Sequence, residues 1–409
     1  MAQNSKPNVF RRILYVVVCA LALYGARQYF RPARSILRTG PMVQLPEPDR
    51  LSISWQMKSI SGGAVILKYP DGHSYKQRAD RDADRFEASF DKLNPGATYS
   101  YTVRRLGVIF DDTVAGPYEV RMPPKPGTPF RFLAFGDSGN GSNTQSDLAK
   151  VMAASKPDLI IHAGDLIYPS GLASDYPTNF FEPYAELIRR IPFMPTLGNH
   201  DVATDHGAPF LNVFELPRNG PPGIEAERNY WFDYGDARFV GLDSNPPEES
   251  GIITAQQRET IVAPWLRKTL QESHARWKFV YYHHPFFTGS EHPESGGEHM
   301  KGPFMRIYEE CGVDMVICGH NHLFERTAPM RAEKIVGDGQ GVVYITSGAG
   351  GASKYPERVP PPAYIRAFND SVFSFSQVDV TPETVEFRQI AEDGKTLDQY
   401  TLKKPTAGL

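Results

Sequence analysis

Five short motifs, each placed where an apolar run of strand length ends, carry oxygen or nitrogen donors and restrict the possible folds of this chain. Four of them begin where such a run stops, and the other, at His283, closes one directly. Strands of a parallel sheet form sites at their carboxyl ends, so we expect the five motifs to converge. Their donors are Asp137, Asp165, Asn199, His283, His320 and His322.

These donors predict a site for two metal ions. Carboxylate, amide and imidazole groups suit zinc, manganese or iron better than soft thiophilic metals. Any one motif alone is weak, since a Gly-Asp pair at a strand end is usually a turn, but five in order favour a dinuclear site. Asp165 is the best candidate to bridge the ions. Two cations about 3.5 to 4 Å apart are a recurring device for displacing an oxygen at phosphorus.

The N-terminal residues contain an apolar run at 13–26 with lysine and arginine on both sides. It is shorter than the ~20 residues that a spanning helix needs, which favours an export signal. The arginines that follow leave open that the run is kept as a membrane anchor. We assign residues 1–40 to this segment and a linker, and expect a periplasmic, extracellular or membrane-anchored protein.

Residues 41–122 are expected to form a small β-sandwich of the fibronectin type III or immunoglobulin-like kind. Strand-like runs such as Leu51–Trp55 and Tyr99–Val103 alternate with turns. The stretch from Leu93 to Tyr99 looks like the tyrosine corner of such sandwiches. A Pro-rich hinge, Pro117 to Pro129, is expected to follow.

Residues 128–405 are expected to form an α/β domain (α+β by some schemes). Strands over 130–135 and 158–161 enclose a helix over 143–155, which makes a βαβ unit. A helix around 304–311 should end at Gly312, a natural residue after a helix. Cys311 and Cys318 are interpreted as small core residues, although an exported protein would permit a disulfide.

The charge of the chain argues against nucleic acid as a partner. Its formal net charge is −3, from 44 basic and 47 acidic side chains, so it has no overall basic field. We expect a small phosphorylated substrate, and a membrane only through the N-terminal segment. The oligomeric state is open.

Two exchanges in the motifs identify a resemblance to a known family. The chain resembles the calcineurin-like metallophosphoesterases, which usually carry Asp-x-His at the first motif; here Asp137-Ser-Gly139 has glycine, and Gly-Asp165-Leu-Ile-Tyr168 supplies a tyrosine. A glycine in the first motif together with a tyrosine in the second is typical of purple acid phosphatases. The resemblance implies a four-layer β-sandwich flanked by helices, after the smaller sandwich.

The resemblance also implies which residues bind each ion. Tyrosine as a phenolate ligand favours iron(III), and the companion ion in the family is iron, zinc or manganese. His200 and His292 would then lie beside the phosphate, with His299 as an alternative to His292, while His284 only flanks the ligand. The first ion would take Asp137, Asp165, Tyr168 and His322, and the second Asp165, Asn199, His283 and His320.

The expected function is therefore that of an acid phosphatase, which hydrolyses phosphate monoesters through a metal-bound hydroxide. A histidine with an ordinary pKa near ~6.5 is protonated in acid, so an acidic or near-neutral optimum is expected. A phosphodiesterase acting on nucleotides or lipid headgroups has the same motifs. A non-catalytic surface binding protein is the alternative of another class.

Overall fold

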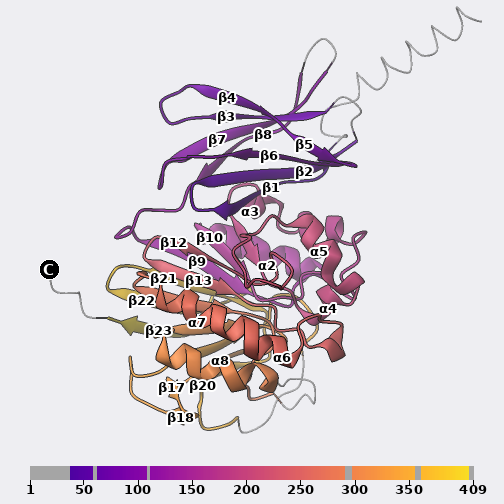
Figure 1. Ribbon diagram of the computed structural model, residues 1–409. Coiled ribbons are helices and arrows are strands. Elements are labelled where there is room, and N and C mark those ends of the chain that lie inside the picture. The colour runs from indigo at the N-terminus through magenta and orange to yellow at the C-terminus, as the bar shows by residue number, and fades with distance from the viewer. Residues whose placement is uncertain (1–36, 59–61, 108–110, 291–296, 355–360, 405–409) are drawn as a thin grey trace, which may run out of the picture.

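The computed structural model describes residues 37–58, 62–107, 111–290, 297–354 and 361–404 (Figure 1). Two small sheets at the N-terminal side stand above two larger sheets with helices around them (Figure 1). The apolar run at 13–26 lies outside the described residues. Within those residues, no helix is both long and apolar enough to cross a membrane.

The two small sheets are antiparallel and share a core, as predicted for a sandwich. One has the strand order β1-β2-β6-β5 and the other β4-β3-β7-β8. Trp55 stacks on Phe86 inside it, with ring centroids 5.7 Å apart. The Tyr99 hydroxyl accepts the backbone N–H of Asn94 (2.9 Å), which is the bond expected across the corner. The strands are β1 (Leu37–Glu47), β2 (Arg50–Met57), β3 (Gly63–Lys68), β4 (Ser74–Arg78), β5 (Asp80–Asp82), β6 (Arg85–Phe90), β7 (Thr98–Arg105) and β8 (Asp112–Arg121).

The expected bounds of this part stay a prediction, as does its likeness to fibronectin type III, but the hinge was predicted too early. Pro117 lies inside β8, so only residues 122–129 separate the last small strand from Phe130. A proline cannot donate to a strand ladder. The register of β8 against β7 shifts between Tyr101 and Val103, and this irregularity lets β8 continue past Pro117.

Two larger mixed sheets carry the rest of the chain. In the six-stranded sheet, β11-β10-β9-β21-β22-β23, the first three strands are parallel. In the seven-stranded sheet, β12-β13-β14-β15-β19-β16-β20, strands β13, β14, β15 and β19 are parallel. The strands are β9 (Phe130–Phe135), β10 (Leu159–His162), β11 (Phe193–Pro195), β12 (Tyr230–Tyr234), β13 (Ala237–Gly241), β14 (Trp277–Tyr281), β15 (Met315–Cys318), β16 (Phe324–Thr327), β19 (Val343–Ser347), β20 (Ile365–Asn369), β21 (Ser374–Val380), β22 (Thr384–Ala391) and β23 (Thr396–Lys403), with a small pair β17 (Met330–Arg331) and β18 (Lys334–Ile335).

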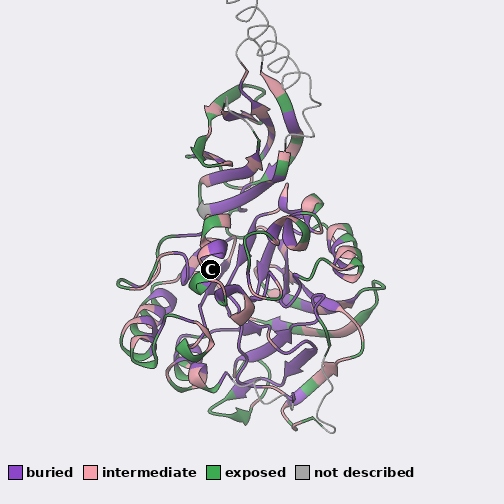
Figure 2. Cartoon of the chain, turned by 90° about the vertical axis from the view of Figure 1, so that its right-hand side faces the viewer, coloured by how far each residue is buried: buried purple, intermediate pink, exposed green. Residues whose placement is uncertain are grey.

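Aromatic rings fill the space between the two larger sheets. Phe132 of β9 meets Phe239 of β13 and Phe279 of β14 edge to face, each at 5.1 Å between centroids. Figure 2 shows these strands as buried, with the exposed faces on the surrounding helices and loops. The helices are α2 (Asn143–Ala154), η2 (Pro177–Phe181), α3 (Ala185–Ile188), α4 (Asn199–Val202), η3 (Asp205–Gly207), α5 (Ala208–Val213), η4 (Pro247–Glu249), α6 (Ala255–Gln257), η5 (Arg258–Val262), α7 (Ala263–Gln271) and α8 (Glu298–Glu310).

Helices complete the four layers that the resemblance implied. Leu148 of α2 packs into the core that contains β9 and β10. Leu266 of α7 and Ile307 of α8 pack with Val280 and Val316 of the seven-stranded sheet. The expected fold class is therefore confirmed.

Two local predictions near α8 have different outcomes. The helix begins at Glu298, well before the expected start. Gly302 and Pro303 disfavour a helix interior, but the helix continues through both. Gly312 follows it with a φ of 68°, as expected. Cys311 and Cys318 are both buried and free.

Candidate dinuclear metal site

The predicted donors lie where the parallel strands of both large sheets end. Three come from the six-stranded side, since Asp137 follows β9, Asp165 follows β10, and Asn199 opens α4 just after β11. His283 follows β14 and His320 follows β15 on the seven-stranded side. The remaining two donors are Tyr168 and His322, which stand in the loops after β10 and β15.

Three other donors surround the hydroxyl of Tyr168. That oxygen lies 2.9 Å from Asp165 Oδ2 and 3.0 Å from His322 Nε2. It lies 3.4 Å from Asp137 Oδ1, which is 3.5 Å from His322 Nε2. We call Asp137, Asp165, Tyr168 and His322 the first donor group.

Asn199 meets two histidines in a similar way, and one of these histidines also contacts Asp165. Asn199 Oδ1 lies 2.9 Å from His283 Nε2 and 3.1 Å from His320 Nδ1, and these two nitrogens are 3.2 Å apart. His283 Nε2 is also 3.4 Å from Asp165 Oδ2. We call Asp165, Asn199, His283 and His320 the second donor group. Asp165 Oδ2 thus contacts both groups, which is the position of a bridging ligand.

Three of the donor residues have a backbone conformation that side chains other than glycine rarely adopt. The φ angles are 59° at Asp137, 57° at Asp165 and 69° at His320. Such angles cost free energy and persist where the surroundings enforce them, often at functional sites. Here the backbone N–H of His320 donates to Asp137 Oδ2 (2.8 Å), and that of His200 donates to Asp165 Oδ1 (2.9 Å).

The hydrogen bonds of two imidazoles indicate that cations belong between the donors. His283 Nδ1 lies 2.8 Å from the carbonyl oxygen of Ala163, and His322 Nδ1 lies against that of Ser353. A carbonyl oxygen only accepts, so Nδ1 carries a proton and Nε2 is the nitrogen that faces the donor group. In the second donor group Nε2 of His283 lies 2.9 Å from the amide oxygen of Asn199, and two such atoms come this close only with a positive charge between them, either a proton on Nε2 or a metal ion. Histidine ligands are oriented in this way in metal sites.

The electrostatics of the site also favour positive charge. Asp137, Asp165 and His283 are almost completely buried. Burial works against a charged His283, but Asp165 and Asp137 outweigh it and raise the pKa of this imidazole to about 10. Burial together with the charge of Asp165 raises the pKa of Asp137 well above its ordinary value. The donor sets of both groups therefore fit two metal ions.

Of the two histidines predicted to contact substrate, one lies within the described residues and the other does not. His200 lies beside the site, with Nε2 3.9 Å from Asp165 Oδ2 and its ring 4.3 Å from that of Tyr168. His292 lies outside the described residues, so its role stays a prediction. His299, the alternative, donates from Nε2 to the carbonyl oxygen of Ser244 (2.7 Å) and contacts neither donor group.

Asp201 supports the site in a way that the sequence analysis missed. It accepts the backbone N–H groups of Leu166, Ile167 and Gly198. Burial, with the charge of Asp165, raises the pKa of its carboxyl to about 7. Asp201 thereby ties the segment after Asp165 to the start of α4. An acidic residue three positions after Gly198 is the capping pattern that could have indicated this role.

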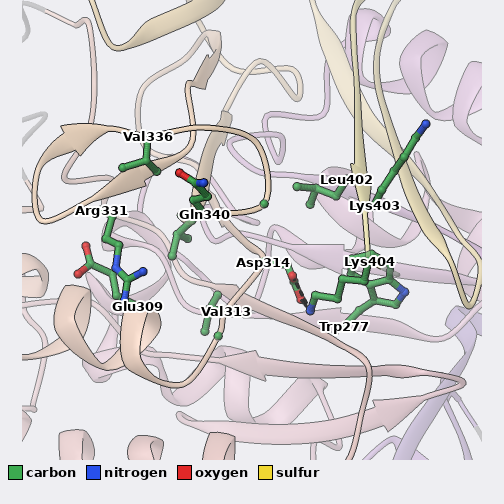
Figure 3. Close-up of a pocket in the computed structure, with 14 residues that line it drawn as sticks. Trp277, Glu309, Val313, Asp314, Arg331, Val336, Gln340, Leu402, Lys403 and Lys404 are labelled. Atoms are coloured by element: carbon green, nitrogen blue, oxygen red, sulfur yellow. Dashed lines mark hydrogen bonds and ion pairs between the residues drawn. The ribbon is translucent and has the colours of Figure 1, made fainter. Parts of the chain in front are cut away.

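A cavity of about 740 Å³ lies at the other end of the strands (Figure 3). Trp277, which begins β14, and Asp314, which precedes β15, line it, whereas the metal donors follow the ends of these strands. Lys404 in this cavity is already bonded to Asp314 (2.6 Å) and lies over the Trp277 ring (Figure 3). The cavity is therefore separate from the donor groups.

Comparison with known families matches two consecutive parts of the chain. Residues 130–324 match the calcineurin-like phosphoesterases. Residues 341–399 match the C-terminal part of iron/zinc purple acid phosphatase-like proteins. The first match contains all seven donors.

Relatives and solved structures agree with these matches. A nucleotide pyrophosphatase/phosphodiesterase of Hordeum vulgare is 24% identical over 71% of this chain and 88% of its own. The Fe(3+)-Zn(2+) purple acid phosphatase 12 of Arabidopsis thaliana is 26% identical over 64% of this chain and 60% of its own. The structure of purple acid phosphatase PPD1 from yellow lupin has a TM-score of 0.75 at 18% identity and covers 89% of this chain and 74% of its own.

Proposed function

This chain is a purple acid phosphatase-like metallophosphoesterase, a phosphoester hydrolase with two metal ions, and we propose that it acts on phosphate monoesters as an acid phosphatase. The observation that carries the proposal is the contact of Asp165 Oδ2 with Tyr168 of the first donor group and His283 of the second. This contact would allow one carboxylate to hold two ions, and a pair of ions is a recurring device for phosphoryl transfer.

The proposed ions are iron(III) in the first donor group and iron(II), zinc(II) or manganese(II) in the second. The phenol of Tyr168 supports the first assignment, since a phenolate is a hard anionic donor. The amide and two imidazoles of the second group suit a divalent ion. The two cations, when bound, polarise phosphoryl oxygens and lower the pKa of water from 15.7 toward ~7.

His200 is proposed as the residue that donates a proton or a hydrogen bond to the substrate. Its Nδ1 lies 2.6 Å from the carbonyl oxygen of Pro169, so that nitrogen carries a proton and the ring is fixed. Its Nε2 remains for the substrate, and its side chain is 34% exposed, at the edge of the buried donors. A positioned acid of this kind contributes about 10²- to 10⁴-fold. A phosphoryl oxygen or the leaving oxygen of the substrate is the atom it would contact.

The phosphodiesterase is the second candidate, favoured by the name of the Hordeum vulgare relative, which covers most of its own length in the comparison. Both candidates need the same donors. The non-catalytic alternative is not supported, because the chain retains all seven donors and brings them together. We also propose that the protein is exported from the cytoplasm. Its substrate would be a small phosphorylated molecule, and we expect no nucleic acid partner.

Hydrolysis of two esters of one chromogenic alcohol tests the proposal. A monoester and a diester of that alcohol have the same leaving group, so the ratio of their kcat/KM values reports whether the enzyme prefers a monoester or a diester. We expect the monoester to be hydrolysed faster, with an optimum in acid or near neutrality. A higher kcat/KM for the diester would assign the phosphodiesterase activity instead. Elemental analysis of the same sample identifies the ions, together with its visible spectrum, in which charge transfer from the Tyr168 phenolate to iron(III) would give an absorption band.

A further inference from the structure

We propose that Ser244, His284 and Glu249 form a support that positions the second donor group and thereby retains the second metal ion. The inference rests on the proposed dinuclear function. None of these three residues belongs to either donor group. His284 follows the ligand His283 directly, and Glu249 ends η4 on a separate loop.

The imidazole of His284 is a packing surface for the two histidines of the second donor group. It is fully buried. Its ring centroid lies 4.5 Å from that of His320 and 4.9 Å from that of His283. Any rotation of the His284 ring would therefore displace one of these two ligands.

Ser244 and Glu249 prevent that rotation. His284 Nδ1 lies 2.8 Å from Ser244 Oγ, and His284 Nε2 lies 2.9 Å from Glu249 Oε2. Ser244 Oγ accepts the backbone N–H groups of His283 and His284, both at 3.2 Å. The hydroxyl has one proton left, which it donates to Nδ1, so Nε2 carries the ring proton and donates it to the Glu249 carboxylate.

The same bonds exclude His284 as a ligand itself. Nitrogen atoms of His283, His284 and His320 lie within 4.8 Å of one another, which is close enough to hold an ion. Both nitrogens of His284 are already bonded, however, to Ser244 and to Glu249. His284 consequently acts through His320 and His283, as a positioning residue.

The support reaches from the buried ligands to the surface. The Glu249 side chain is 38% exposed, whereas that of His284 is only 1% exposed. The Ser244 carbonyl oxygen accepts a hydrogen bond from His299 in the first turn of α8 (2.7 Å). The loop of η4, strand β14 and helix α8 therefore converge behind the second donor group. Residues that orient metal-binding histidines typically affect metal affinity by 10- to 100-fold.

The retention of each ion in variants tests the proposal. Glu249→Gln keeps the size of the side chain but removes its charge, and His284→Phe keeps the ring but removes both hydrogen bonds. Asp71→Asn is the matched control, because Asp71 forms a similar pair with His73 (2.5 Å) on the exposed surface of the sandwich. The metal content is measured after dialysis against a graded chelator, and the visible band marks the ion at Tyr168.

We expect both variants to release the second ion at chelator concentrations about 10- to 100-fold lower than the wild type, while the visible band stays. The control should behave as the wild type. Release of both ions together, or retention equal to the wild type in Glu249→Gln, would overturn the proposal. A wild type that binds no metal at all would instead refute the proposed function, so the two failures are distinguishable.

Discussion

The backbone of Gly139 lies so close to Leu166 that a Cβ atom at position 139 would come within 1.4 Å of the Leu166 carbonyl oxygen. The carbonyl oxygen of Gly139 in turn accepts the backbone N–H of Tyr168 (2.8 Å). Position 139, where the superfamily usually has a histidine, therefore has no room for any side chain, and a glycine is required. This contact holds the segment of Tyr168 against the segment of Asp137.

Gly139→Ala should separate these two segments. The methyl group has to displace backbone, which costs about 3 kcal/mol in the free energy of unfolding and moves Tyr168 away from Asp137. Denaturant unfolding and the visible spectrum measure both effects. Gly302→Ala is the control, since the residue lies in α8 and, outside its own stretch of the helix, no atom of the described residues lies within 4 Å of a Cβ there. An unchanged spectrum in Gly139→Ala would show that the contact does not place Tyr168.

Tyr168→Phe should abolish visible absorption and leave the fold intact. The substitution removes only the hydroxyl, which lies 2.9 Å from Asp165 and 3.0 Å from His322. The matched control is Tyr176→Phe, because Tyr176 is a buried tyrosine whose hydroxyl has no hydrogen-bond partner among the described residues. Absorption spectra and metal content provide the measurement. A coloured Tyr168→Phe protein would refute the phenolate assignment.

Asp165→Asn should lose both ions, whereas Asp137→Asn should lose mainly the first. Asp165 Oδ2 contacts side chains of both donor groups, whereas Asp137 meets the second group through the backbone N–H of His320, which does not bind metal. A neutral amide binds a hard cation less well than a carboxylate, and we expect activity to fall by at least about 10²-fold in Asp165→Asn. Metal analysis of the two purified variants separates the predictions. If the two variants retain the same ions, Asp165 is not the bridge.

His200→Asn should lower kcat without changing metal content. The side chain lies outside both donor groups, while its backbone N–H, which any residue supplies, is the atom that bonds Asp165. A loss of about 10²- to 10⁴-fold in kcat is expected for removal of an acid. Steady-state kinetics on a monoester provide the measurement, with metal analysis beside it. Loss of metal in this variant would assign His200 to the ligands instead.

Glu325 gives the stability a dependence on pH. It is buried, accepts the backbone N–H of Gly289 (2.7 Å) and the hydroxyl of Thr346 (3.1 Å), and burial raises its pKa to about 7. The folded protein thus holds a proton that the unfolded chain releases near pH 4.5. This stabilisation is complete below the unfolded pKa and is lost as the pH rises through about 7.

Glu325→Gln should remove this dependence. Relative to the variant, the wild type should lose about 3 kcal/mol of unfolding free energy between pH 4 and pH 8, since each unit of pKa shift corresponds to 1.36 kcal/mol. Urea unfolding of both proteins at the two pH values, with the same metals present, measures the difference. All other titratable groups are the same in both proteins, so their contributions cancel in the difference between the two unfolding free energies. A difference that is constant with pH would refute the shifted pKa.

The donors of the site could be predicted because a strand end and a metal-binding side chain are both visible in a local stretch of sequence. Asp137 and His320 are examples, since each follows an apolar run. The left-handed backbone at these residues could not be predicted, because it depends on hydrogen bonds between segments far apart in the chain. The bridging position of Asp165 needed both donor groups in place.

The features that the sequence did not indicate have the same physical origin. His284 flanks the ligand His283 as expected, but its bonds to Ser244 and Glu249 could not be predicted, because these two residues are distant from it in sequence. Pro117 marks a hinge by composition, but pairing with β7 keeps it in a strand. Tertiary contacts outweigh local preference at such positions.

Each donor group takes ligands from both large sheets. In the second, Asn199 follows a strand of one sheet, whereas His283 and His320 follow strands of the other. An ion bound there would therefore hold the two packed sheets together at this edge, and its removal would release that connection. The same ions would then serve both catalysis and the stability of the fold, so removing them with a chelator should lower the free energy of unfolding as well as the activity.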